Sequence, residues 1–467
     1  MNNLAVDLTT WAEEHFGGCD LGDKRLTKRL VQVAAAVGAN PSGSFPEQMD
    51  GWGDLKAAYR LFDSEAVTFD AVATPHWERT RAQKAGQYLI LSDTTEMDFG
   101  ITRKIPKLGP TGNGGGYGFL LHSGLMVSAR TEEILGLTAQ VIHYRKPAPK
   151  GENTTQRLRR KRESQIWGKV IDQTGRPPEN VEFIHVMDRG ADNFEVFCHA
   201  WEQGAGWVIR VTQMGRKILT PSGEKIGLRQ YLDTLPVAGT YDLHLRARPN
   251  QPARMAKLEV RFGACSMLEP AQKSPYVKRL KPGAISMWVV WVHEVNAPPG
   301  VEPIEWVLYT SARVASFAEA LCVIGYYEKR WLIEEWHKAL KTGCRVADRQ
   351  LKTKGRLEPM TALMSVEAVR LLQLKSVARS EPERPAEEVV PELWILMLIL
   401  ARKLPRGKKM TVGEFYRGMA KLGGFIGRKG DGEPGWITIW RGWERLNTLV
   451  RGAELASELK ALRRNCG

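Results

Sequence analysis

Two apolar runs in this sequence each end on an aspartate. The stretch YLILSDTTEMDF, residues 88–99, contains Asp93, and VEFIHVMDRGADNF, residues 181–194, contains Asp188. Short apolar runs of this kind, rich in β-branched and aromatic residues, are typical of buried strands. We therefore predict strands at 88–93 and 181–188. As neighbours in a mixed sheet, they would bring both carboxylates to one edge.

The region around these two runs has the pattern of an α/β fold. Further strands are predicted at 119–129 and 134–144, and a basic segment at 156–173 enters a helix. From 205 to 312 short β-prone runs alternate with Gly/Pro turns, which predicts an all-β insertion. The glycine-rich stretch at 109–118 lacks the GK[ST] ending of a phosphate-binding loop and is interpreted as a turn.

The N-terminal residues 1–75 are predicted to be helical and basic. A helix beginning near Asp23 would place four cations together and turn Leu30 away from them; the cations are Lys24, Arg25, Lys28 and Arg29. A solvated helix face and a DNA contact both fit this pattern. The whole chain has 67 Lys+Arg against 52 Asp+Glu, a net charge of +15. Because such an excess attracts polyanions, nucleic acid is the expected partner.

The remaining composition excludes several other classes of protein. Six cysteines are scattered with no pair at metal-ligand spacing, so we expect neither a zinc site nor a disulfide framework. The N-terminus lacks the pattern of a signal peptide, and the longest apolar run, 393–401, is too short to span a bilayer. The sequence thus predicts a cytoplasmic protein, helical again from about 315, with a linker at 378–392.

The third informative stretch is YEKRWLIEEWHKALKTG, residues 327–343. Four of its polar residues are separated by three, four and seven positions: Tyr327, Arg330, Glu334 and Lys341. On a helix, residues at these separations lie on one face. Glu335 would lie about 100° away. A salt-bridged surface helix would also explain the Arg330–Glu334 spacing.

The two aspartates favour a catalytic interpretation of Glu334. Phosphoryl transfer on DNA suits two divalent cations roughly 3.5–4 Å apart, and Mg²⁺ prefers carboxylate oxygens. We predict that Asp93 lies between two Mg²⁺ ions per active site, with Asp188 and Glu334 flanking, and that Mn²⁺ can substitute. Three nearby acids past the strand ends, where solvated loop acids are the default, rank lower: Asp98, Asp192 and Glu195.

With these residues in order, the sequence resembles the DDE transposases of the bacterial insertion-sequence-four group, which includes the cut-and-paste composite-transposon transposase. SDTT and MDRGAD resemble the first two acid motifs of that family. The third acid motif of the family has the spacing Tyr, two residues, Arg, three residues, Glu, six residues, Lys, and residues 327–341 agree with it. LGDKRLTKRLVQVA resembles the end-binding segment, and KLGGFIGRK with WRGWERL resembles the dimerisation region.

The resemblance implies an architecture and roles for particular residues. It implies a helical DNA-end-binding domain at 1–75, a ribonuclease H-like core at 76–375 with the β insertion, and a helical dimerisation region at 376–467. Tyr327 and Arg330 would hold a phosphate beside a flipped base, and Lys341 would contact the DNA end. Trp306 would stack on that base, although core packing also explains this residue, and Arg210 would contact phosphate.

The implied activity is transposition of a mobile element. A homodimer would bind the inverted-repeat ends in a synaptic complex, cut them with metal-activated water, and join the 3′ ends to target DNA, through a hairpin. Two alternatives stay open: a ribonuclease H-like endonuclease without strand transfer, and a catalytically silent DNA-binding inhibitor of transposition. The sequence departs from relatives at Ser92, before the first acid, and at Trp331 and Leu332, after Arg330. Leu26 also departs from them within the basic cluster, so no terminal-repeat sequence is carried over.

Overall fold

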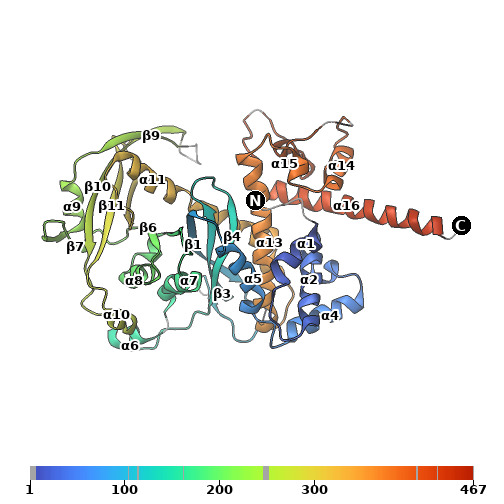
Figure 1. The fold of residues 1–467 in the computed structure, drawn as a ribbon, viewed down its shortest axis with the longest axis horizontal. Helices are drawn as coiled ribbons and strands as arrows, with labels where there is room; N and C mark the ends of the chain where they lie inside the picture. Colours follow the sequence, from blue (N-terminus) through green and yellow to red (C-terminus); the bar gives the residue numbers. More distant parts are fainter. Residues whose placement is uncertain are drawn as a thin grey trace.

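The structure is a computed structural model that describes residues 7–103, 105–112, 115–160, 162–245, 252–405, 407, 409–428 and 430–465. A large mixed sheet occupies one side of the molecule, and helical N-terminal and C-terminal regions lie together at its other side (Figure 1). Among the described residues, no helix combines the length and apolar character needed to cross a membrane.

The N-terminal region is helical, as predicted. Its helices are α1 (Leu8–Phe16), α2 (Lys24–Ala39), α3 (Phe45–Gln48), α4 (Trp52–Asp63) and α5 (Phe69–Arg81). The basic helix α2 begins after Asp23, whose carboxylate accepts a hydrogen bond from the Arg25 N–H at 2.8 Å. Helix α5 continues to Arg81, so the domain boundary expected at residue 75 falls inside a helix.

The first half of the sheet holds the two predicted aspartate-bearing strands side by side. Its strands are β1 (Gly86–Asp98), β2 (Gly109–Thr111), β3 (Gly116–Ser128), β4 (Ile134–His143), β5 (Val181–Met187) and β6 (Gly206–Arg210). The order is β4-β3-β1-β5-β6, with β3 antiparallel to β1 and β4, and β5 parallel to β1 and β6. The segments between them are α6 (Thr154–Arg159), η1 (Glu163–Gln165), α7 (Ile166–Thr174), η2 (Arg189–Ala191) and α8 (Phe194–Gln203).

Both faces of β1 are covered, which explains its continuous apolar run. Leu89 and Leu91 belong to the main hydrophobic core, which includes residues of the N-terminal helices and of the long C-terminal helix. Ile90, on the opposite face, packs with Met126 and Phe183. Successive side chains of a strand point to opposite faces, so a run without polar interruption is expected where both faces are buried.

The insertion after β6 is not all-β, contrary to prediction. It contains β7 (Lys217–Leu219), β8 (Lys225–Gly227), α9 (Leu228–Thr234), β9 (Gly239–Leu245), β10 (Arg254–Met267), α10 (Pro275–Leu280), β11 (Ile285–Val295) and β12 (Glu305–Thr310). Helix α9 forms because Leu228, Tyr231 and Leu232 recur at helical spacing and bury one face. Helix α10 follows the N-cap Ser274, with proline at its first position. Strand β12 pairs with β6, so the described residues form one 12-stranded sheet.

The C-terminal region is helical and includes two long helices. Its elements are α11 (Phe317–Glu328), α12 (Trp331–Lys338), the π-helical turn η3 (Ala339–Gly343), η4 (Val346–Asp348), α13 (Lys354–Ser380), η5 (Ala386–Glu388), α14 (Glu392–Ala401), α15 (Val412–Leu422) and α16 (Trp436–Asn465). The boundary expected at residue 376 and the start of the predicted linker at 378 both fall inside α13. The end of α16 extends away from the body of the molecule (Figure 1).

Candidate active site

Asp93 lies within a strand and not at its end, which corrects the sequence prediction. Strand β1 continues to Asp98 because its antiparallel pairing with β3 extends that far. Its parallel pairing with β5, in contrast, stops at Ser92 opposite Met187. One residue further along each strand are Asp93 and Asp188. The two carboxylates therefore leave the backbone where two parallel strands separate.

Glu334 reaches Asp93 through an arginine. The single helix predicted for 327–343 is interrupted, because α11 ends at Glu328 and α12 begins at Trp331. Arg330 lies in this break. One of its terminal nitrogens is 3.2 Å from Asp93 Oδ2, and the other is 2.5 Å from Glu334 Oε1. Asp93 and Glu334 thus contact different terminal nitrogens of one guanidinium group.

The electrostatics of Asp93 reflect this gathering of acids. Burial is the main cause that raises the pKa of Asp93 to about 6. The Thr94 N–H, which donates to its carboxylate at 2.7 Å, and the Arg330 guanidinium oppose that rise, whereas the charges of Asp188 and Glu334 add to it. Three carboxylates therefore act on one another at this edge of β1.

The residues present fit a divalent cation in their chemistry. In the described part of the chain, no three His, Cys, Asp or Glu side chains form a ready-made group of metal ligands. At this site the Arg330 guanidinium provides the positive charge between Asp93 and Glu334. Their oxygens are the hard donors that Mg²⁺ prefers, and their mutual repulsion favours binding of a cation.

Asp188 is half-buried and accepts a hydrogen bond from the Gly190 N–H at 2.7 Å. The three acids that the sequence ranked lower lie in other surroundings. Asp192 is buried, not a solvated loop acid as the sequence suggested, because Arg216 and two backbone N–H groups bind its carboxylate. Glu195 pairs with Arg162, and Asp98 is exposed at the end of β1.

Glu335 points away from this site, as its helical position predicts. Its side chain is 9% exposed. One carboxylate oxygen accepts from Lys338 Nζ at 2.9 Å, and the other contacts Lys375 and accepts from Trp436 Nε1 at 2.6 Å. The helix that carries Glu334 is thereby fixed to α13 and α16. Sequence reasoning missed this role, since nothing in the local pattern indicates those distant partners.

Of the predicted DNA-contact residues of the core, Trp306, Tyr327 and Arg210 lie near one another. The rings of Trp306 and Tyr327 meet edge to face, with centroids 6.1 Å apart. Trp306 is half-buried, and next to it the Glu305 carbonyl accepts from Arg210 at 3.1 Å. Lys341 is exposed, and partial desolvation lowers the pKa of its ammonium despite the charges of two acids at the far end of β1.

The predicted N-terminal cations differ in their availability. Arg25 is exposed but pairs with Asp23 at 2.8 Å, and Arg29 pairs with Asp54 at 2.8 Å. Lys24 and Lys28 are exposed, and neither forms an ion pair with any residue that the structure describes. Exposed and unpaired cations are the ones that can neutralise phosphates without first breaking a contact within the protein.

Two families match the flanks of this chain. Residues 8–67 match the transposase DNA-binding family, and residues 366–461 match the Tn5 transposase dimerisation domain. The first match contains α2 with its basic residues, and the second begins within α13 and includes most of α16. The three acids lie between the two matched segments. These similarities support a Tn5-like DNA transposase with an N-terminal DNA-binding domain and a C-terminal dimerisation domain.

Proposed function

We propose that this protein is a cut-and-paste DDE transposase of the insertion-sequence-four group. It binds the inverted-repeat ends of a mobile element, cuts them, and joins the 3′ ends to target DNA in the bacterial cytoplasm. The observation on which this proposal depends is the bridge from Asp93 through Arg330 to Glu334, beside Asp188, between segments similar to transposase domains.

The topology of the sheet supports a ribonuclease H-like core. In the order β4-β3-β1-β5-β6, β3 runs antiparallel to β1, whereas β4, β5 and β6 run parallel to β1. In such a sheet the acids of β1 and β5 share one edge. The helix α12, which follows the insertion, contributes the third acid.

Asp93, Asp188 and Glu334 would hold two Mg²⁺ ions, or Mn²⁺. Such ions, when bound, activate the attacking oxygen and stabilise the leaving oxygen of a phosphodiester. The side chains around them orient the DNA. Both terminal nitrogens of Arg330 contact Asp93 and Glu334; with cations bound to these acids, they would be released to bind a phosphate bidentately. Trp306, half-buried against Tyr327, can stack on a flipped base. The freed 3′ hydroxyl would attack the opposite strand, which forms a hairpin and releases the flanking DNA. Water would then open the hairpin and regenerate the 3′ hydroxyl, which finally attacks a phosphodiester of target DNA.

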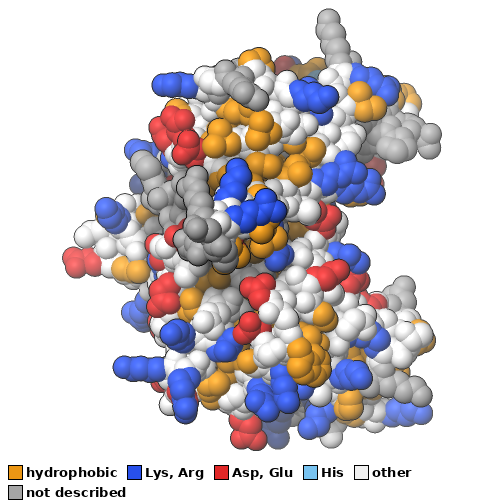
Figure 2. Space-filling view, turned by 90° about the vertical axis from the view of Figure 1, so that its right-hand side faces the viewer, with side chains coloured by type: hydrophobic (Ala, Val, Ile, Leu, Met, Phe, Trp, Pro, Cys, Tyr) orange, Lys and Arg blue, Asp and Glu red, His pale blue; other side chains and the backbone are white. Residues whose placement is uncertain are grey.

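The exposed surface supports a homodimer. Helix α16 exposes Leu455, Leu459 and Leu462, which recur at helical spacing on its extended part. Helix α14 exposes Leu396 and Leu400. Figure 2 shows hydrophobic side chains gathered on the face toward which α16 extends. Apolar groups arranged in this way are typical of an interface between protein chains.

The decisive experiment measures binding and cleavage of the flanking ends of the gene's own element, with Mg²⁺ and with chelator. We expect Asp93→Ala, Asp188→Ala and Glu334→Ala to abolish cleavage and to leave end binding intact. Asp98→Ala, which removes an exposed acid of the same strand, is the matched control and should cut normally. Full cleavage by purified Glu334→Ala protein would contradict the proposal.

The same assay separates the two alternatives. A nuclease without strand transfer would cut the ends but would not join precut ends to target DNA. An inhibitor of transposition would bind the ends and leave them uncut in Mg²⁺.

A further inference from the structure

The carboxylate of Glu305, the residue before Trp306, is held by donors from two other elements. Arg229 on α9 binds it bidentately, with N–O distances of 2.8 Å and 3.1 Å. The indole N–H of Trp291 on β11 donates to the same carboxylate at 2.9 Å. The Arg229 guanidinium also lies over the Trp291 ring, 5.3 Å from its centroid. We call this set of contacts the Glu305 clamp.

The backbone of Glu305 has a further partner. Its carbonyl accepts from Arg210 at 3.1 Å, and Arg210 lies at the end of β6, which pairs with β12. One residue thus joins Arg210, expected at a phosphate, to Trp306, expected at a base. Successive side chains of a strand point to opposite faces. The clamp therefore holds β12 from the face that the Trp306 ring does not occupy.

The position of Trp306 depends on how β12 begins, because this residue is only the second of the strand. The preceding residues 298–303 include three prolines, which have no N–H to donate to a neighbouring strand. The N–H of Ile304 donates to the buried carboxylate of Glu294 at 3.1 Å. Two carboxylates, those of Glu294 and Glu305, thus define where the strand starts.

The clamp contributes more to geometry than to stability. The side chains of Arg229 and Glu305 are 43% and 40% exposed, and exposed ion pairs add little to the free energy of unfolding. A bidentate arginine–carboxylate pair nonetheless fixes the orientation of both groups. Trp306 is half-buried and meets Tyr327 edge to face, so the direction of its ring follows from the backbone that the clamp holds.

We propose that Glu305 and Arg229 are positioning residues that hold the Trp306 ring at a fixed place beside Arg210, where it receives an unpaired base. This inference rests on the proposed function. Because the phosphate contact and the stacking ring are joined through one residue, the clamp sets the separation between the phosphate and the base that the site can bind.

The test compares full-length Arg229→Met and Glu305→Gln with Arg279→Met. The first two variants break the same ion pair but change the net charge in opposite directions. Arg279 is another exposed arginine of the insertion, and its contacts with Glu202 and Tyr276 do not involve β12, so its replacement is the charge-matched control. Gel shifts measure the affinity of each protein for element ends that are fully paired or carry one unpaired base beside the cut. The ratio of the two affinities is the preference for an unpaired base.

Stacking of a base on an aromatic ring contributes about 5- to 150-fold in affinity, and Trp306→Ala should remove that preference. We expect Arg229→Met and Glu305→Gln each to lower the preference by about 3-fold or more, whereas Arg279→Met keeps it. In the Trp306→Ala background, Arg229→Met should change the preference no further, because the clamp acts through this ring. A general structural defect would instead weaken binding of both kinds of end.

Two results would overturn the inference alone. One is an unchanged preference in Arg229→Met and Glu305→Gln while Trp306→Ala loses it. The other is weaker binding of both kinds of end by Arg229→Met and tighter binding of both by Glu305→Gln, which would indicate a direct phosphate contact of Arg229. A preference that survives Trp306→Ala would overturn the stacking role, and the positioning role with it. A wild-type protein that neither binds nor cuts element ends would overturn the proposed function itself.

Discussion

Replacement of Asp93 by asparagine should stabilise the metal-free protein. The Asp93 side chain is 19% exposed and lies near two other acids, so its ionised form is unfavourable in the folded state. Asparagine has nearly the same shape as protonated aspartate and keeps an oxygen that can accept from Arg330. The substitution thus removes an unfavourable charge and retains the packing.

The magnitude follows from the pKa of Asp93. Folding raises this pKa from 3.8 to about 6, and a rise of about two units corresponds to about 3 kcal/mol. Between about pH 4 and pH 6 the folded protein retains a proton that the unfolded chain has lost, so this group lowers the free energy of unfolding as the pH rises. Above that window the destabilisation is complete, and Asp93→Asn should recover up to about 3 kcal/mol.

The assay is urea unfolding of the wild type and of Asp93→Asn in EDTA, at about pH 4 and about pH 7. The variant should be more stable at the higher pH, and the difference should vanish at the lower pH. Buried acids distant from Asp93 contribute equally to both proteins and cancel. Added Mg²⁺ should stabilise only the wild type, since a bound cation favours the ionised carboxylate. A variant less stable than the wild type at neutral pH in EDTA would refute this reasoning.

Three further predictions test the surroundings of the site. Glu335→Gln should cost about 3–5 kcal/mol in urea unfolding, because buried Lys375 loses its carboxylate, and adding Lys375→Met should restore part of that loss. Trp306→Ala should weaken binding of an element end with an unpaired base by about 1–3 kcal/mol in gel shifts; equal weakening for fully paired DNA would indicate core packing instead. Leu455→Glu combined with Leu459→Glu should abolish the dimer in sedimentation and leave the DNA-binding domain able to bind ends.

The adjacency of Asp93 and Asp188 could be predicted from the sequence because it depends on local pattern. Two apolar runs buried on both faces are typical of neighbouring central strands, and parallel pairing brings corresponding ends together. The end of β1 could not be placed in the same way, because its two neighbours stop pairing with it at different residues. Pairing with β5 ends at Ser92, whereas pairing with β3 continues as far as Asp98. The buried Thr95 and Met97 continue the alternation and were a signal of that extension.

The break between α11 and α12 has no comparable signal. Residues 326–338 contain neither glycine nor proline, so local propensity favours one continuous helix. What distinguishes this point is tertiary: Arg330 lies in the break and binds both Asp93 and Glu334. Arg330 and Glu334 contact each other as predicted, because they are a single turn apart. The continuous helix predicted for residues 327–343 was wrong.

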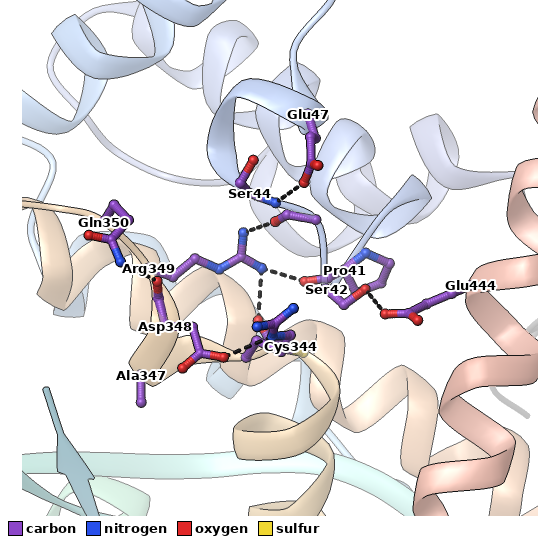
Figure 3. Close-up of polar contacts among 12 residues, drawn as sticks. Pro41, Ser42, Ser44, Glu47, Cys344, Ala347, Asp348, Arg349, Gln350 and Glu444 are labelled. Carbon is purple, nitrogen blue, oxygen red and sulfur yellow. Dashed lines mark hydrogen bonds and ion pairs between the residues drawn. The ribbon is translucent and has the colours of Figure 1, made fainter.

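Arginines that bind backbone carbonyls show a deeper limit of sequence reasoning. A carboxylate partner is a residue type that can be sought in a sequence, as with Asp54 for Arg29. Arg349 and Arg103 instead bind backbone carbonyls, as Figure 3 shows for Arg349, and every residue supplies one, so no pattern of side chains marks the acceptors. Such contacts depend on the position of the backbone and not on the identity of the acceptor residue. Substitutions in the 41–44 loop that preserve its backbone path should therefore leave its contacts with Arg349 intact, whereas loss of this guanidinium should break them.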